Sequence, residues 1–116
     1  MKYVDAFVAS VQTGKRDAYL AHAKKFDLLF KEHGAARVVE CWEGDVPEGK
    51  LTSFPLAVKR EPGEAVVFGF IEWASKQARD AAWEKLRNHP DMQGMANMPF
   101  DGKRMIYGGF DVIMEV

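Results

Sequence analysis

The chain has 116 residues, of which 47% are hydrophobic and 28% are charged, and its formal net charge is -1. This composition is that of a globular protein and excludes disordered and collagen-like chains. Basic and acidic residues are mixed throughout, which argues against a nucleic-acid-binding surface because such a surface needs clustered positive charge.

A chain of this length holds one hydrophobic core, so we expect a single domain over residues 1–116. Cys41 is the only cysteine, which rules out an internal disulfide bond and fits a reducing compartment. No stretch approaches the roughly 18 apolar residues of a membrane span, and Asp5 interrupts the apolar run that a secretion signal would need. We therefore expect a cytoplasmic protein that contacts neither membrane nor nucleic acid.

The first part of the chain predicts a strand, a helix and a second strand. Residues 2–10 alternate as a strand does and are rich in residues that favour strands. Residues 15–33 change to a helical spacing, with Gly34 as the stop just past the end. The stripe on one side of this helix consists of Tyr19, His22, Ala23, Phe26, Leu29, Phe30 and His33. Residues 37–43 predict the second strand, which a polar, turn-rich loop follows.

The second part predicts two more strands and one more helix. Its elements are, in chain order, a short apolar segment at 54–59, a strand at 65–73, a helix from 75 to about 88, an irregular segment at 90–101 and a strand at 104–114. Ser75 is the expected N-cap of the helix, and Pro90 is its expected stop. The order βαββαβ predicts an α+β fold of ferredoxin-like type, with an antiparallel sheet and both helices on one face.

The alternation along each strand assigns its side chains to two faces of the sheet. The face expected under the helices is mostly small and aliphatic: Val4, Ala6, Val8, Val39, Cys41, Val67, Ile71, Trp73, Ile106, Phe110 and Val112. The opposite face carries six aromatic side chains among its twelve residues. These residues are Tyr3, Asp5, Phe7, Val38, Glu40, Trp42, Val66, Phe68, Phe70, Glu72, Tyr107 and Asp111. A soluble monomer does not leave so large an apolar patch in water, so we expect a homodimer that stacks sheet on sheet. A bulge would reverse the assignment of a strand, and Gly108 with Gly109 is a place for one.

Four acids, one on each strand, fall on that aromatic face: Asp5, Glu40, Glu72 and Asp111. Burial among aromatic side chains raises the pKa of a carboxyl group, which tunes it toward general acid or base catalysis at neutral pH. The alternative is structural, because the same acids would fix the register of the dimer by pairing with Arg37, Lys103 or Arg104.

The histidine and cysteine side chains lack the spacing of a metal site. His22 and His33 are about three turns apart on one helix, too far to share a metal ion, so we expect neither a metal nor a cofactor. His22 is a candidate base at a cavity between helix and sheet, or else a hydrogen-bonded residue at the edge of the core. Cys41 is expected under the helices as a small buried side chain.

Several large side chains are candidates for the wall of a pocket. Trp42 and Trp73 end their strands, and with Phe68 and Phe70 they either bind a ligand or seal the core. Three methionines within residues 90–101 either line an adaptable apolar mouth or pack a loop over the end of the sheet.

Three phrases of the sequence, KYVDAFV, RVVECWEGDVPEGK and MPFDGKRMIYGGF, occur in this order along the chain. Together they resemble the YbaA-like family of small bacterial proteins of unknown function, and the likeness covers essentially the whole chain. The resemblance implies a dimeric α/β-barrel but brings no activity or catalytic residues. Proteins of the wider superfamily include cofactor-free monooxygenases, haem-degrading enzymes, stress-responsive proteins and muconolactone-isomerase-like enzymes, an analogy at the level of fold alone.

Two functions follow as hypotheses. The first is a dimer without chemistry that binds a small, partly apolar molecule between its helices and its sheet. The second is a cofactor-independent enzyme of the monooxygenase or isomerase kind, with Glu40, Glu72 or His22 as its base. In that enzyme Arg104 would hold an anionic oxygen and Tyr107 would donate a hydrogen bond.

Overall fold

The computed structural model describes residues 1–116. At its centre is a four-stranded sheet in which every pair of neighbouring strands is antiparallel. The strands are β1 (Tyr3–Gln12), β2 (Arg37–Trp42), β3 (Glu64–Trp73) and β4 (Ile106–Asp111). Their order across the sheet is β2-β3-β1-β4, so the two longest strands lie in the middle. The chain is therefore α+β with an antiparallel sheet, which confirms this part of the prediction.

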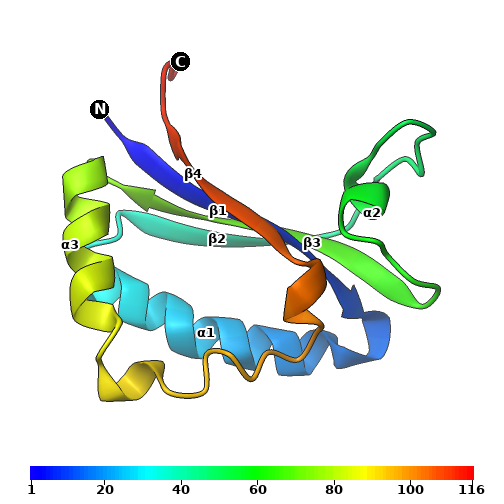
Figure 1. Cartoon of the computed structure of the whole chain (residues 1–116), viewed down its shortest axis with the longest axis horizontal. Coiled ribbons are helices and arrows are strands. Elements are labelled where there is room, and N and C mark those ends of the chain that lie inside the picture. The colour runs from blue at the N-terminus through cyan, green and yellow to red at the C-terminus, as the bar shows by residue number, and fades with distance from the viewer.

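Three α-helices and three short 3-10 helices connect the strands. The α-helices are α1 (Arg16–Glu32), α2 (Phe54–Ala57) and α3 (Lys76–Leu86), and the 3-10 helices are η1 (Thr13–Lys15), η2 (Pro90–Met92) and η3 (Gly102–Arg104). The helices α1 and α3 lie on one side of the sheet, and the single turn α2 lies on the other side near one end (Figure 1). None of the helices has both the length and the apolar character that crossing a membrane requires.

The helix boundaries follow from local chemistry in the sequence. Gly34 follows α1 with a φ of +108°, a conformation that glycine adopts without the strain a side chain would add. The hydroxyl of Ser75 caps α3 because it accepts a hydrogen bond from the Ala78 amide at 3.0 Å. Both expected boundaries are confirmed.

The last strand is shorter than the sequence predicts. It begins at Ile106 rather than at residue 104, because the preceding residues form η3. Asp101 caps that turn by accepting a hydrogen bond from the Lys103 amide at 3.0 Å. The guanidinium of Arg104 then donates two hydrogen bonds to the Glu64 carboxylate, at 2.7 and 2.8 Å, which hold the turn against β3.

The predicted assignment of side chains to the two faces of the sheet is correct for β3 and reversed for β1, β2 and β4. The register places the following side chains on the side of α1 and α3: Tyr3, Asp5, Phe7, Ala9, Val11, Val38, Glu40, Trp42, Val67, Gly69, Ile71, Trp73, Tyr107, Gly109 and Asp111. We call this side the helix face. The other side, the open face, presents Val4, Ala6, Val39, Cys41, Phe68, Phe70, Ile106 and Phe110. Asp5, Glu40 and Asp111 thus share a face, and Glu72 lies on the opposite one.

Two glycines give the physical reason for this arrangement of faces. A Cβ atom added to Gly69 would come within 2.6 Å of the Phe7 ring, and one added to Gly109 would come within 2.8 Å of the Tyr3 ring. The missing side chains on β3 and β4 therefore leave room for the large aromatic rings of β1 under the helices. From the sequence we expect the small side chains of β1 to face the helices. In the structure the large side chains of β1 face them, and the room for these comes from the glycines of the neighbouring strands.

The core lies mainly between the helix face and the helices. Its largest cluster joins Tyr3, Phe26, Leu29, Phe30, Ala35, Ile71, Trp73, Ala82 and Leu86. A smaller cluster of Val8, Val58 and Val66 lies on the other side of the sheet, at the end that α2 covers. The rest of the open face is not covered, and the exposed fractions of Phe68, Ile106 and Phe110 are 37%, 45% and 60%.

Candidate functional site

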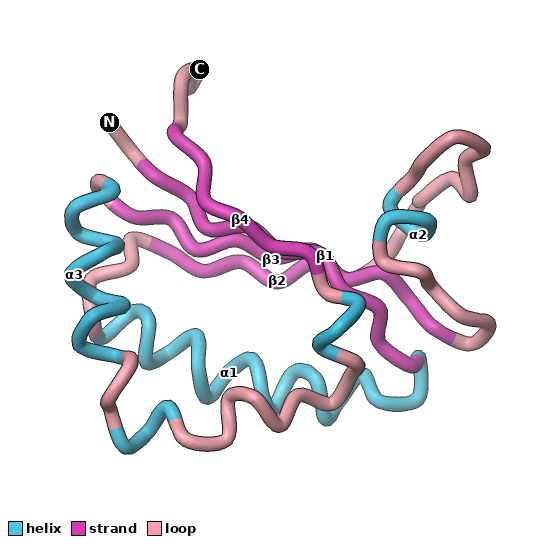
Figure 2. Tube along the Cα trace, in the orientation of Figure 1, coloured by secondary structure: helices cyan, strands magenta, loops and turns pink.

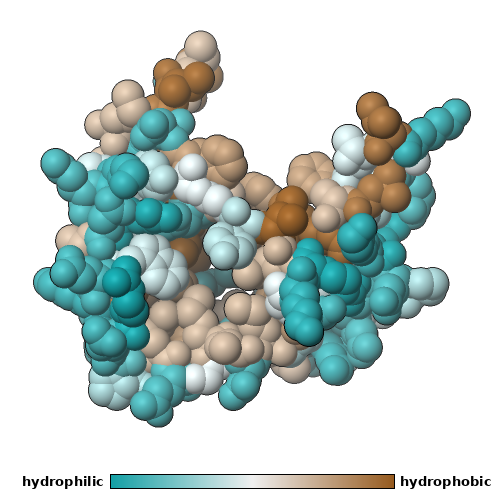
Figure 3. Space-filling model, in the orientation of Figure 1, coloured by the Kyte–Doolittle hydropathy of each residue, from teal (hydrophilic) through white to brown (hydrophobic).

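A cavity of about 610 Å³ lies between the helix face, α1, α3 and the segment that joins α3 to β4. Twenty residues line it, and thirteen of them are hydrophobic. Figure 3 shows the molecule hollowed between the sheet and this segment, with apolar side chains along the rim. The apolar wall includes Phe7, Phe26, Phe30, Ile71, Met95, Met98, Phe100 and Met105. A concave, mostly apolar space of this volume is typical of a small-molecule site.

The outer wall of the cavity is the segment after η2, which passes below the sheet and returns to β4 (Figure 2). It contacts α1 at two points. The His22 Nε2 atom lies 3.3 Å from the Met95 carbonyl oxygen, and the rings of Tyr19 and Phe100 are 6.0 Å apart. Met95 and Met98 line the cavity, and Met92 and Met95 pack against the main core. The segment is irregular, as predicted, and it supplies both the mouth and the packing that were considered for its methionines.

Three polar side chains meet in the wall of the cavity. Glu40, in the middle of β2, accepts a hydrogen bond from the Tyr19 hydroxyl of α1. Its side chain also hydrogen-bonds to Asp27, two turns further along α1. All three residues line the cavity. We call this group the carboxyl cluster.

The environment of the carboxyl cluster favours neutral forms of two of its members. Burial, followed by the hydrogen bond and charge of Glu40, raises the pKa of Asp27 to about 9. Burial, followed by the same carboxylate, raises the pKa of the Tyr19 phenol. Near neutral pH Asp27 and Tyr19 are therefore protonated, and both are donors toward Glu40. Such a group can give and take a proton.

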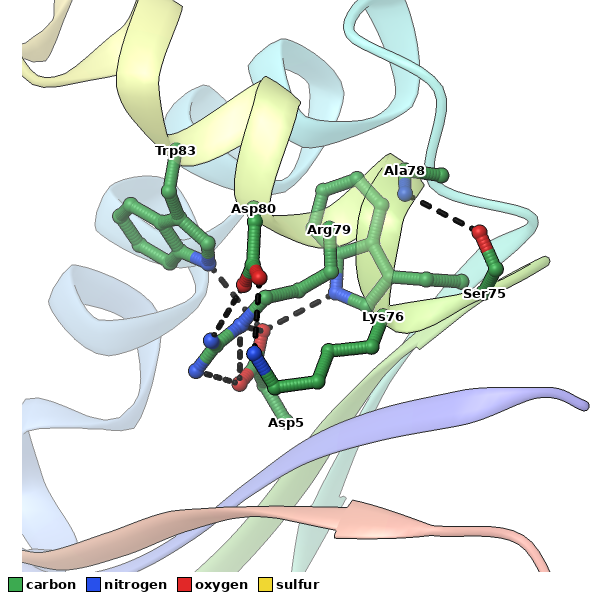
Figure 4. Close-up of polar contacts among 8 residues, drawn as sticks. Asp5, Ser75, Lys76, Ala78, Arg79, Asp80 and Trp83 are labelled. Carbon is green, nitrogen blue, oxygen red and sulfur yellow. Dashed lines mark hydrogen bonds and ion pairs between the residues drawn. The ribbon is translucent and has the colours of Figure 1, made fainter.

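A second polar group, around Asp5, is neutralised within the fold. Arg79 of α3 reaches down to the Asp5 carboxylate and donates hydrogen bonds from Nε and Nη2, at 3.0 and 2.8 Å (Figure 4). The indole nitrogens of Trp73 and Trp83 donate to the same carboxylate, at 3.0 and 3.1 Å. With its acceptor sites used in this way, Asp5 joins α3 to the sheet and forms one wall of the cavity.

The structure brings together three of the nine residues that the sequence analysis proposed as site residues. Glu40, His22 and Tyr107 all line the cavity. His22 also stacks on Phe26, with ring centroids 4.8 Å apart, and Tyr107 stands at the rim with 79% of its surface exposed. His22 thus lies at a cavity and contacts a backbone carbonyl oxygen at the same time, and its role as a base stays a prediction.

Two of the charged candidates lie outside the cavity and have partners of their own. Glu72, on the open face, pairs with Arg37 at 2.8 Å and with Lys2 at 3.1 Å. Arg104 is held by Glu64 and also donates to the Lys59 carbonyl at 2.9 Å. Each of them fixes a strand or turn in place.

The four proposed aromatic residues do not form one wall, and none of them lines the cavity. Trp42 packs near Tyr19, with ring centroids 6.5 Å apart, and Trp73 is fully buried in the core. Phe68 and Phe70 lie on the open face, with centroids 6.2 Å apart. Cys41, expected under the helices, is exposed on the open face instead, because the face of β2 is reversed.

Replacing Gly69 with alanine is expected to destabilise the protein by about 1–3 kcal/mol, the usual cost of overpacking. The new Cβ atom would lie 2.6 Å from the Phe7 ring and 3.1 Å from the Glu40 Oε1 atom, so both side chains must move. Chemical denaturation measures the loss. Gly14→Ala is the matched control, because a Cβ atom there meets nothing within 4 Å. Equal stability of the two variants would contradict the close packing around Gly69.

Comparison with known proteins places the chain beside sequences whose function is also undetermined. A family described as "Protein of unknown function (DUF1428)" matches residues 2–102. The "Uncharacterized protein YbaA" of Escherichia coli is 56% identical over 116 residues, which cover 99% of each chain. The protein of the same description from Shigella flexneri has the same identity and coverage. The likeness that the three sequence phrases indicate therefore extends over the full length.

Proposed function

The chain belongs to the DUF1428 family, and from this premise we propose that it is a homodimeric protein that binds a small, partly apolar molecule between its helices and its sheet. The observation that carries the proposal is the cavity of about 610 Å³. Its lining is mostly apolar, and its polar groups include the carboxyl cluster and the group around Asp5. This combination fixes the orientation of a ligand as well as its affinity.

The lining defines the chemistry of the ligand. Aromatic rings and methionine side chains surround its body, which favours a flat or compact apolar framework. In the carboxyl cluster the hydroxyl of Tyr19 and the carboxyl group of Asp27, which hydrogen-bond to Glu40, become donors to a ligand oxygen when they turn toward it. An uncharged oxygen, such as that of a ketone, suits this cluster better than a carboxylate, which Glu40 would repel.

Binding of an aromatic ketone is expected to change the methyl NMR signals of the methionines selectively. In protein with ¹³C-labelled methionine methyl groups, 2-tetralone or phenylacetone should shift the signals of Met95, Met98 and Met105, which line the cavity. The signals of Met1 and Met114 should stay in place, because these residues are exposed near the chain ends. A titration that shifts none of the three, or all methionine signals equally, would count against this ligand site.

A pair of variants tests whether the shifts report on the cavity itself. Met98→Lys places a charge in the apolar wall and is expected to weaken binding at least tenfold, because the ammonium group loses water when a ligand covers it. Gln93→Lys adds the same charge to an exposed position of the same segment and should leave the affinity unchanged.

The proposed homodimer rests on the open face. Phe68, Ile106 and Phe110 are partly exposed there, and Phe54 and Leu56 of the neighbouring α2 are 52% and 47% exposed. A second copy covers such a surface with a single two-fold axis, sheet against sheet. The strand order β2-β3-β1-β4, with α1 and α3 together on the other face, supports the ferredoxin-like arrangement from which a dimeric α/β-barrel is built. The exposed thiol of Cys41 suits the cytoplasm, the reducing compartment that we propose.

Sedimentation equilibrium at micromolar concentration is expected to give twice the chain mass of 13.1 kDa. Phe68→Lys places a charge in the middle of the open face and should convert the protein to a monomer, because an unpaired buried charge is costly at an interface. Leu28→Lys is the matched control, since Leu28 is also exposed, at 55%, but lies on α1. Wild-type protein that sediments at the mass of a single chain would refute the dimer.

A further inference from the structure

The carboxyl cluster differs from three other acids with little exposed side-chain surface, Asp5, Glu64 and Glu72, in having no cationic partner. Arg37 pairs with Glu72, Arg79 with Asp5, and Arg104 with Glu64. Glu40 instead has two neutral donors, the Tyr19 phenol and the Asp27 carboxyl group, and it faces a cavity. A carboxylate that serves only structure is usually matched by a cation, as the other three are. The arrangement around Glu40 instead resembles a reservoir for one mobile proton.

We propose that Glu40, Asp27 and Tyr19 catalyse a proton shift in a small, mostly apolar ketone that has a hydrogen on the carbon next to its carbonyl group. The proposal rests on the proposed function, because it requires that the cavity binds such a molecule. It assigns chemistry to two residues of α1, Tyr19 and Asp27, and to one residue of β2.

The step balances without any other reactant. The Glu40 carboxylate takes the proton from the carbon, the electrons of the C–H bond form a C=C bond, and the carbonyl electrons move onto oxygen. Asp27 gives its proton to that oxygen while Tyr19 donates a hydrogen bond to it, which yields the enol. The single negative charge passes from Glu40 to Asp27 and stays within the cluster. Return of a proton from Glu40 to the same carbon, while the enol oxygen gives its proton back to Asp27, regenerates the ketone with its hydrogen exchanged against solvent. In a ketone with a C=C bond beyond that carbon, return of the proton to the far end of the dienol completes an isomerisation.

The surroundings of the carboxyl cluster favour a neutral substrate. Three cations, Lys24 and Lys31 of α1 and Arg37 of β2, share a shallow surface hollow with the outer side of Asp27. None of these three cations lines the cavity. The cations that do line it are Arg79, which pairs with Asp5, and Arg87, and neither forms an ion pair with Glu40, which faces a lining that is mostly apolar. His22 is the other titratable group of α1 in the cavity, and its Nε2 atom is directed at the Met95 carbonyl oxygen.

The test is solvent exchange of carbon-bound hydrogen in D₂O, followed by proton NMR, with 2-tetralone and phenylacetone as probes and the full-length protein as catalyst. Wild-type protein should exchange the hydrogens next to the carbonyl group at least tenfold faster than buffer alone. Glu40→Gln should return the rate to that of buffer. Tyr19→Phe and Asp27→Asn should lower the exchange rate by about 10-fold to 100-fold. The first removes a hydrogen-bond donor to the developing oxyanion, and the second removes the group that gives it a proton.

Glu84→Gln, on the exposed side of α3, is the matched control and should keep the wild-type rate. The methionine methyl spectra, recorded on the same samples, separate the two proposals. Probes that bind in the cavity without faster exchange, or a Glu40→Gln variant that keeps the wild-type rate, would overturn the proton shift and leave the binding function standing. Probes that shift no cavity methionine would overturn both proposals.

Discussion

Replacing Asp5 with alanine is expected to lower the free energy of unfolding by about 3–4 kcal/mol, the largest loss that we expect from one substitution. The change removes the acceptor for Arg79 and for the indole nitrogens of Trp73 and Trp83. The cost is high because a partly buried guanidinium and two indole N–H groups are left without a partner. Urea denaturation of the purified variant measures it.

The exposed acid of the same group provides the control. Asp80 contacts the same Arg79 at 2.9 Å and Lys76 at 2.8 Å, but 47% of its side chain is exposed (Figure 4). Asp80→Ala should therefore cost no more than about 1 kcal/mol, as exposed ion pairs do. Equal losses for the two variants would show that proximity to Arg79, rather than buried acceptor sites, determines the stability. Replacing Asp5 and Arg79 together with leucine should recover part of the loss.

The stability of the wild-type protein is expected to fall by about 1–3 kcal/mol between about pH 5 and about pH 9, and Asp27→Asn should remove this fall. The pKa of Asp27 is raised to about 9 in the folded protein, whereas an unfolded aspartate has a pKa of about 3.9. Between these values the folded state binds more protons than the unfolded state, so stability decreases as pH rises. A single group can change the free energy of unfolding by at most about 1.4 kcal/mol per pH unit, and the partial exposure of Asp27 to solvent keeps the loss below this limit.

Denaturation curves at several pH values measure this slope, with Asp17→Asn as the control on the exposed first turn of α1. Carboxyl groups with lowered pKa values, such as Glu64 beside Arg104, act in the opposite sense. Their contribution is complete above the unfolded pKa of glutamate, about 4.3, and therefore does not mask the slope. A flat wild-type profile between about pH 6 and about pH 9 would mean that Asp27 is ionised in the fold.

Periodicity and capping residues predict the four strands and the two long helices, but not the helical turn α2 or the 3-10 turn η3 before the last strand. The helical spacing from Tyr19 to Phe30, the stop at Gly34 and the cap at Ser75 act within a few residues, so they can be read locally. The faces of the strands could not be predicted in this way. Whether Phe7 points toward the helices depends on the missing side chain of Gly69, 62 positions away, and only the pairing of β1 with β3 brings these two residues together.

The same distinction applies to the candidate site. The sequence identifies Glu40 as an acid beside aromatic residues, whereas its partner Asp27 lies outside the stripe of α1 that runs from Tyr19 to His33. The available signal was its position next to Phe26 at the edge of the buried stripe, where a carboxyl group faces either water or the sheet. Glu72 and Arg104 were attractive candidates as charged residues near buried strands. Their partners, Arg37 and Glu64, come from other strands that the sequence does not align.

The methionines in the cavity wall have a consequence for how the protein ages under oxidising conditions. No methionine belongs to the fully buried core, whereas Met95, Met98 and Met105 all border the cavity. Oxidation of a thioether to the sulfoxide turns a flexible apolar side chain into a polar one. Oxidation of these three side chains would therefore make the cavity lining more polar, and at Met95 and Met105, which pack against the two larger core clusters, it would also weaken the core.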